Sequence, residues 1–356
     1  MKLNEICEVY SGYALKAFND AEDGLPVIKI GNILTDGTLN LEECQYTTDS
    51  VNEKYYSQRG DIYIALSGAT TGKIGIMDAG EKYVINQRVG IVRQKSDDVP
   101  QEYIKYFLLR QTNRILQEAA GCAQPNISPK QIAEYVIPDT SQEKMQEICE
   151  VLDRIKKIID SRKAEMSALD DLIKARFVEM FGDVQHEEKY KGIQLGELCT
   201  TMSGGTPSTK FPEYYEGDIP WISTVSLGPN YIDGTTAKGY ITQEAVDNSA
   251  TKLIPAGNIL FGTRVGVGKS SLNNVDICTN QDIVAIVGID ESKFNRLFIK
   301  HVLDAYQSYY DSIKKGATIL GITGDDLKDT LIPNAPIEIQ IEFEKFVNQV
   351  DKSKFC

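Results

Sequence analysis

Apolar residues recur every three or four positions along residues 142–181, a stretch that contains no proline and no glycine. This spacing places them on one face of an α-helix, and two apolar positions in every seven are typical of a coiled-coil seam. At 1.5 Å per residue, such a helix spans roughly 60 Å. The alternative is a long amphipathic helix that lies on a domain core, for which a broader apolar face is expected. The seam positions expected to contact a partner helix are Met145, Ile148, Leu152, Ile155, Ile159, Met166, Leu169, Ile173 and Met180.

On both sides of this helix, short runs of β-branched residues lie between turns rich in Gly, Asn and Asp, a pattern that predicts strands. A stretch with helical periodicity follows the strands on each side. We therefore expect a mixed α/β domain before the long helix and another after it. The expected strands are residues 27–30, 61–64, 89–92, 220–222, 258–261 and 283–287, and the expected helices are residues 102–117 and 294–312.

The two α/β regions are copies of one sequence. A displacement of about 195 residues aligns short blocks in the same order along both regions. The aligned blocks include Gly72-Lys73 with Gly268-Lys269, Asn86-Gln87 with Asn280-Gln281, and Ile137-Pro138 with Ile332-Pro333. The sequence from Gln340 onward also resembles the start of the long helix. We therefore divide the chain into a first domain (residues 1–141), a spacer helix (142–181), a second domain (182–339) and the start of a second, shortened helix (340–356).

Composition narrows the class of protein. The chain has 356 residues, a net charge of -13, seven cysteines, and His186 and His301 as its two histidines. No apolar run is long enough to span a membrane, and the N-terminus carries an acid, Glu5, where a signal peptide would carry basic residues, so we expect a cytoplasmic protein. The widely spaced cysteines include no C-x-x-C pair, and two histidines leave little for a metal site or a Ser-His-Asp site. We therefore expect no metal site and no histidine-based catalytic site in this chain.

Three segments recur in both copies and could contact a ligand. The first, the glycine turn (residues 68–73 and 262–270), resembles a phosphate-binding loop, but it has three or five residues before Gly-Lys where that loop needs four. It suits either close backbone approach to a polyanion or simply a tight turn. The second is the amide segment (residues 86–88 and 280–282), whose amide groups could read adenine edges or cap a turn. The third segment spans residues 121–128 and 316–323.

The amide segment differs between the copies at one informative place. Arg88 in the first copy aligns with Asp282 in the second. A shared fold with different residues at one position is what two readers of different sequences would show.

The order of these parts resembles the specificity subunit of type I restriction-modification systems. The resemblance is carried by the third segment, by an Ile-Pro about a dozen residues after it, by Gln142 at the start of the long helix, and by Met180-Phe181-Gly182 at its end. It covers essentially the full chain. In that family, two target recognition domains each read half of a split DNA site, and two long helices that pair antiparallel hold them apart.

The resemblance also implies partners. Members of the family are not enzymes; they dock DNA adenine methyltransferase subunits and then endonuclease-translocase subunits, to which S-adenosylmethionine, ATP and magnesium belong. Because the net charge is negative, we expect this chain to read bases while its partners supply most of the grip on DNA phosphates. The candidate DNA contacts are Ser67, Thr70, Thr71, Lys73, Asn86, Gln87, Arg88, Gln124 and Asn126 in the first domain, and Thr263, Arg264, Lys269, Asn280, Gln281, Lys314, Lys315 and Thr318 in the second.

The end of the chain departs from the family pattern. With a second helix that is shortened, the seam formed by Ile159, Met166, Leu169 and Ile173 is expected to face water. Self-association through this seam, or pairing with a methyltransferase subunit, would cover it. Two other readings remain open: a single-chain enzyme that modifies or cleaves DNA, and a coiled-coil interaction scaffold that binds no DNA.

Overall fold

The computed structural model describes residues 1–20, 23–78, 80–120, 125–186, 189–316 and 319–354. The chain forms two compact units, Met1–Ser161 and Arg162–Cys356. The long helix α5 (Gln142–Phe181) coincides with the helix expected from the sequence and contributes residues to both units. Within the described ranges, no helix combines the length and the apolar character that a membrane span requires.

The first unit combines two small sheets with helices. Its strands are β1 (Cys7–Ser11), β2 (Leu25–Ile28), β3 (Gln45–Thr47), β4 (Ile62–Ala65), β5 (Ile74–Ile76), β6 (Val84–Ile85) and β7 (Val89–Gln94). Its helices are α1 (Leu3–Ile6), α2 (Gln101–Arg110), α3 (Thr112–Ala119) and α4 (Pro129–Ala133), with 3-10 turns η1 (Ile30–Asn32) and η2 (Glu53–Tyr55).

The second unit repeats this order with additional short elements. Its strands are β8 (Gly192–Gln194), β9 (Thr200–Ser203), β10 (Ile219–Ile222), β11 (Tyr231–Ile232), β12 (Gly239–Ile241), β13 (Ile259–Gly262), β14 (Ser270–Asn273), β15 (Cys278–Thr279), β16 (Ile283–Val287) and β17 (Leu331–Pro333). Its helices are α6 (Leu195–Leu198), α7 (Gln243–Asp247), α8 (Arg296–Ala305), α9 (Gln307–Ile313), α10 (Gly324–Lys328) and α11 (Ile337–Ser353), with 3-10 turns η3 (Pro212–Tyr215), η4 (Thr224–Ser226) and η5 (Gly234–Thr236).

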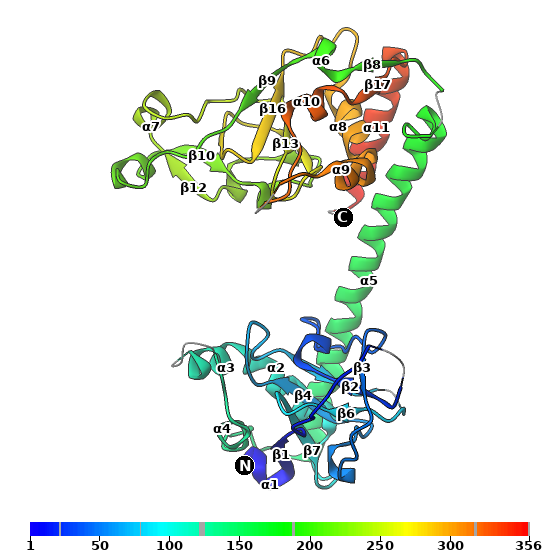
Figure 1. Cartoon of the computed structure of the whole chain (residues 1–356), viewed down its shortest axis with the longest axis vertical. Helices are drawn as coiled ribbons and strands as arrows, with labels where there is room; N and C mark the ends of the chain where they lie inside the picture. Colours follow the sequence, from blue (N-terminus) through cyan, green and yellow to red (C-terminus); the bar gives the residue numbers. More distant parts are fainter. Residues whose placement is uncertain (21–22, 79, 121–124, 187–188, 317–318, 355–356) are drawn as a thin grey trace. The chain divides into compact units, whose positions relative to one another are not determined.

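The sheet topology shows that the sequence repeat is also a structural repeat. The strand order β1-β7-β4-β5 in the first unit corresponds to β9-β16-β13-β14 in the second, where β11 extends the sheet. Figure 1 labels β1, β4 and β7 of the first sheet and β9, β13 and β16 of the second. Each unit also has a smaller sheet, β3-β2-β6 or β12-β10-β15, whose central strand has one antiparallel and one parallel neighbour. These matches confirm the duplicated, mixed α/β fold expected from the sequence.

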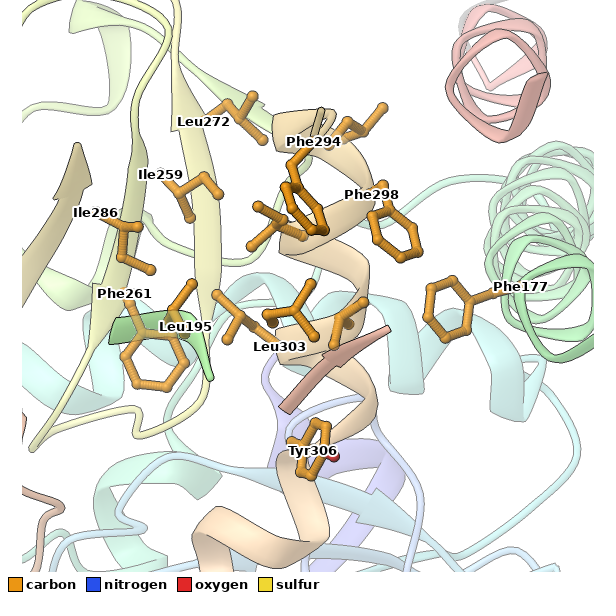
Figure 2. Packing of buried hydrophobic residues seen from close by; sticks show 14 of the residues in the cluster. Phe177, Leu195, Ile259, Phe261, Leu272, Ile286, Phe294, Phe298, Leu303 and Tyr306 are labelled. Atoms are coloured by element: carbon orange, nitrogen blue, oxygen red, sulfur yellow. The ribbon is translucent and has the colours of Figure 1, made fainter. Parts of the chain in front are cut away.

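Helix α8 fills the core of the second unit between the larger sheet and α5. Figure 2 shows Ile259, Phe261 and Ile286 of the sheet facing α8, while Phe298 on the other side of α8 faces Phe177 of α5. The rings of Phe177 and Phe298 stack with their centroids 6.2 Å apart. The C-terminal part of α5 is thus a core element of this unit.

Each expected helix after the main strands is divided in two. Helix α2 ends before Gln111 and α3 follows, and the equivalent break between α8 and α9 falls at Tyr306. Both break residues have ψ near zero, at -2° and 9°. The second of each helix pair starts where the glycine turn packs, since a Cβ at Gly72 would lie 3.4 Å from the Thr112 carbonyl oxygen. Apolar periodicity alone does not reveal such a bend.

Helix α11 lies antiparallel to the C-terminal part of α5. Arg176 Nη2 donates to Glu342 Oε1 at 2.9 Å, and Lys354 Nζ donates to Asp170 Oδ1 at 2.6 Å. Later residues of α11 therefore meet earlier residues of α5. This is the short second helix of the expected antiparallel pair.

The seam positions of α5 fall into three groups. Met145 and Ile148 pack into the core of the first unit, and Leu152 is half-buried. At the other end, Ile173 and Met180 are buried in the second unit's core and Leu169 packs against it. The positions left exposed in the middle are Ile155, Ile159 and Met166, at 49%, 48% and 41%.

The expectation of a water-facing seam is therefore wrong for Leu169 and Ile173. Ile173 is only 3% exposed, because the second domain and α11 both pack against this end of α5. The middle of the seam, with Ile159 and Met166, is exposed as expected. Each end of α5 also behaves as a helix lying on a domain core, the alternative that the seam pattern disfavoured.

Candidate nucleic-acid interface

The three repeated segments of the first domain meet through backbone hydrogen bonds. Leu66, just before the glycine turn, donates its N–H to the carbonyl of Arg88 in the amide segment at 2.9 Å. The Leu66 carbonyl accepts from Ile127 of the third segment, also at 2.9 Å. Gly68 N–H donates to the Pro125 carbonyl at 3.2 Å. Segments that are far apart in the sequence thus lie side by side, and we call the surface that the three repeated segments form the edge of the domain.

The second domain makes the same connections at the equivalent positions. Thr263 N–H donates to the Asp282 carbonyl at 2.8 Å, and the Thr263 carbonyl accepts from Ile322 N–H at 2.8 Å. An isolated bridge between Lys315 and Gly321 closes the third segment. The shared hydrogen bonds make Thr263 the counterpart of Leu66.

The glycine turns are hairpin connections. They join antiparallel neighbours, β4 to β5 and β13 to β14, whereas a phosphate-binding loop leads from a strand into a helix. Gly72 and Gly268 have φ of 82° and 87°, a region that favours glycine. The tight-turn reading therefore accounts for these glycines without a ligand.

The amide segments cap their own turns. Asn86 is buried and its Oδ1 accepts from the Arg88 N–H at 3.1 Å, which is the structural role weighed against base reading. Asn280 Nδ2 donates to Asp282 Oδ2 at 3.1 Å. In both domains the asparagine thus holds the residue two positions later.

The candidate contacts of the first domain divide by exposure. Thr71 is buried and its hydroxyl donates to the Gly68 carbonyl at 2.7 Å, so it serves the turn. The other described candidates offer accessible side chains to different degrees: Gln87, Arg88 and Asn126 are exposed, while Ser67, Thr70 and Lys73 are half-buried. Gln124 lies outside the described residues.

The candidates of the second domain divide in the same way. Thr263 is buried, and its hydroxyl donates to the Asp282 carbonyl at 3.2 Å. Lys314 is half-buried and paired with Asp311. The exposed side chains are those of Arg264, Lys269, Gln281 and Lys315, and Asn280 is half-buried. Thr318 lies outside the described residues.

A cavity of about 600 Å³ opens where the three segments of the second domain meet. Arg264 of the glycine turn and Gln281 of the amide segment line it, together with Lys315, which directly precedes the third segment, and Asp326. Hydrogen bonds from the Thr323 hydroxyl and backbone hold the pKa of Asp326 below its ordinary value, so this carboxylate stays charged at neutral pH. The cavity therefore offers two cations, an amide and an anion to a polar ligand.

Sequence reasoning missed the part played by Gly321. Its position in the third segment aligns with Asn126, and it lies against Arg264. The difference between Asn126 and Gly321 in the aligned copies was the available signal. Across the described part of the chain, no group of three or more His, Cys, Asp or Glu side chains could hold a metal ion.

Comparison with known proteins identifies both halves of the chain. The family model described as the type I restriction modification DNA specificity domain matches residues 1–169 and again residues 187–355. The type I restriction enzyme MjaIX specificity subunit of Methanocaldococcus jannaschii is 30% identical over 159 residues, which are 44% of this chain and 37% of that protein. The EcoR124I/EcoR124II specificity subunit of Escherichia coli is 28% identical over 222 residues, 60% of this chain and 53% of that one. The matches thus span about a third to a half of these relatives' length.

The fold is also that of a solved structure. The type I restriction-modification system S subunit from M. genitalium superposes with a TM-score of 0.53 at 14% identity, covering 99% of this chain and 89% of that chain. At this identity the likeness concerns the fold. The double match of the family model decides the assignment: the chain belongs to the family of type I restriction modification DNA specificity domains, of which it contains two.

Proposed function

We propose that this chain is the DNA sequence-recognition subunit of a type I restriction-modification complex, and that each domain reads one half of a bipartite site in double-stranded DNA. The observation that carries the proposal is the pair of matched edges, which share a backbone frame but present different side chains. If both domains carried the same residues at these segments, we would expect two identical half-sites. Because the residues differ, we expect a split site with two different halves.

Base reading in this proposal falls to the exposed residues of the matched edges. Arginine and amide side chains can make paired hydrogen bonds to base edges in the major groove. The edge of the first domain offers Gln87, Arg88 and Asn126, and that of the second offers Arg264 and Gln281. Because the chain carries a net charge of -13, we assign most of the phosphate contacts to its partners.

The exposed middle of α5 is the proposed docking site for those partners. Ile155 and Ile159 form an apolar stripe on the part of α5 that belongs to the first unit, beyond the residues that pack into the core of that unit, and Met166 continues the same heptad position on the part that belongs to the second. An exposed apolar stripe at heptad spacing is a surface on which another helix can pack. We assign it to methyltransferase subunits; self-association with a second copy of the chain is the competing occupant.

A matched pair of variants tests the docking site. The double substitution Ile155→Asp and Ile159→Asp is expected to abolish co-purification with the methyltransferase subunit. Val178→Asp is the control, since Val178 lies on the same helix with a similar exposure of 51% but outside the stripe. If both variants bind the subunit as well as the wild type, the stripe is not the docking site. Sedimentation of the chain alone distinguishes self-association, which the double variant would then remove.

The chemistry of the complex lies with the partners in this proposal. S-adenosylmethionine would belong to the methyltransferase subunits, and ATP and magnesium to the endonuclease-translocase subunits, all acting on DNA in the cytoplasm. This chain would supply recognition and carry no cofactor of its own.

Selection of bound DNA from a random-sequence pool tests the proposal. The purified complex of this chain with its methyltransferase subunit is expected to enrich a two-part motif, and the chain alone is expected to bind DNA weakly. Strong binding by the chain alone, with affinity that falls steeply as salt rises, would contradict the shared grip. Failure of the complex to enrich any motif would contradict recognition itself.

A further inference from the structure

Two pairs of positions hold the same places in both domains but carry different residues. Leu66 and Thr263 make the same two backbone hydrogen bonds, so the residues that follow them, Ser67 and Arg264, are equivalent. The second pair consists of Arg88 and Asp282. Their carbonyls accept the hydrogen bonds that the N–H groups of Leu66 and Thr263 donate.

A third pair of equivalent positions also carries different residues in the two domains, and each of its members lies against a member of the first pair. Ser67 forms an isolated bridge with Asn126, whereas Arg264 lies against Gly321. A Cβ added at Gly321 would lie 2.6 Å from the Thr263 carbonyl oxygen and 3.0 Å from Cγ of Arg264, so a side chain at this position would press on both the backbone of Thr263 and the arginine. A small residue thus accompanies a larger one in each domain. We call these matched positions the specificity triplet: Ser67, Arg88 and Asn126 in the first domain, and Arg264, Asp282 and Gly321 in the second.

Each triplet contains one arginine, but at a different position. Arg88 belongs to the second pair of positions, and Arg264 belongs to the first. In the second domain Arg264 Nη1 lies 3.8 Å from Asp282 Oδ1, and the arginine side chain remains 56% exposed. In the first domain Arg88 is exposed, and within the described ranges no hydrogen bond or ion pair involves its side chain. Arg88 is thus exposed with no partner among the described residues, and Arg264 stays mostly exposed beside Asp282, so both guanidinium groups are accessible to a ligand.

We propose that the specificity triplet selects a base pair in each half of the DNA site, with Arg88 and Arg264 each donating two hydrogen bonds to a guanine. This inference rests on the proposed function. Arginine matches the O6 and N7 acceptors of guanine in a way that no other base edge reproduces. Asp282 orients Arg264 without contacting the base and is a positioning residue. Since the arginine comes from a different position in each domain, the guanine falls at a different step of each half-site.

The experiment maps methylated adenines by long-read sequencing in a host that lacks adenine methylation and expresses the whole complex. Arg88→Ala is expected to relax one position of one half-site, with discrimination against other bases falling about fivefold or more, while the other half-site is unchanged. Arg264→Ala is expected to do the same to the opposite half-site. Arg59→Ala is the matched control, because Arg59 is exposed but precedes β4 and so lies at the far end of that strand from the triplet.

The outcomes separate base reading from other roles. A uniform fall in methylation with an unchanged motif would mean that the arginines contact phosphates, and it would overturn the inference. A motif that survives both substitutions unaltered would overturn it as well. A wild-type complex that gives no two-part motif would overturn the proposed function and this inference together.

Discussion

Gly72 and Gly268 end the repeated hairpin turns. Each of them packs against the helix pair that follows the main sheet of its domain. Gly268 has a φ of 87°, and a Cβ there would lie 2.1 Å from Oε1 of Gln307. The Gln307 side chain in turn donates to the Val267 carbonyl at 2.9 Å. The turn is thus held against the junction of α8 and α9, and a side chain at this position would displace Gln307 from its hydrogen bond to the turn.

Gly268→Ala is expected to destabilise the second domain by more than about 1 kcal/mol, because alanine is strained at positive φ and clashes with Gln307. Urea unfolding followed by tryptophan fluorescence reports on this domain, since Trp221 is the chain's single tryptophan. Gly239→Ala is the control, because a Cβ at Gly239 meets nothing within 4 Å. Equal midpoints for the two variants would refute the packing explanation.

At the same scale, the repeat in the sequence identified the three candidate segments but did not show how they contact one another. The repeat identified Asn86 and Asn280, and turn capping, which the structure shows for Asn86, was one of the two roles expected for them. The contact of Arg264 with Gly321 depends on two segments that come together only in the folded domain. No local spacing encodes such a contact, so it required the structure.

At the scale of elements, α11 packs on the second domain around a central aromatic cluster. Phe343 is fully buried, and its ring centroid lies 5.5 Å from those of both Phe177 and Phe181 on α5. It also packs edge-on against His301 of α8, with centroids 5.2 Å apart. A single residue therefore joins three helices.

Phe343→Ala is expected to lower the free energy of unfolding of the second domain by about 3–5 kcal/mol, through lost burial and the cavity left between the helices. Urea unfolding monitored through Trp221 measures the change. Ile341→Ala, on the same helix but 37% exposed, should change it by no more than about 0.5 kcal/mol. Similar losses for both variants would show that α11 is not anchored by Phe343.

His301 gives the same interface a dependence on pH. Burial, aided by nearby Lys300 and Lys354, lowers the pKa of His301 well below 6.5, and its Nε2 is buried without a hydrogen-bond partner among the described residues. The unfolded chain therefore binds a proton at a higher pH than the folded domain does. The stability that this neutral histidine contributes is present above about pH 6.5 and is lost as the pH falls toward the folded pKa.

Unfolding midpoints measured between about pH 5 and 8 check this expectation. His301→Gln should lessen the acid-induced loss of stability relative to wild type, whereas His186→Gln, at an exposed histidine, should leave it unchanged. Parallel pH profiles for wild type and His301→Gln would contradict the assignment.

Periodicity predicted the elements better than their packing. The heptad pattern located α5 and its apolar face, but it did not show that the second domain and α11 would cover Ile173 while leaving Ile159 exposed. Coverage of a helix depends on neighbours that are distant in sequence. For the same reason the breaks before Thr112 and Gln307 were not anticipated.

At the scale of the whole molecule, the duplication was readable from the sequence because aligned blocks recur in one order. The sheets repeat with the same strand order and the same mixture of parallel and antiparallel pairs. The residues that differ between the two copies lie on the same backbone arrangement, with equivalent hydrogen bonds in each domain. One chain with two unlike readers predicts an asymmetric, interrupted target.

The central claim is tested most directly by the methylation pattern that the wild-type chain directs. Co-expression with its proposed methyltransferase partner, in a host without adenine methylation, followed by long-read sequencing, reveals every modified adenine. The account predicts a split motif with two unlike halves separated by a spacer of fixed length. A single uninterrupted motif, or a palindrome with identical halves, would contradict the claim that the two domains of one chain each read one half of the site.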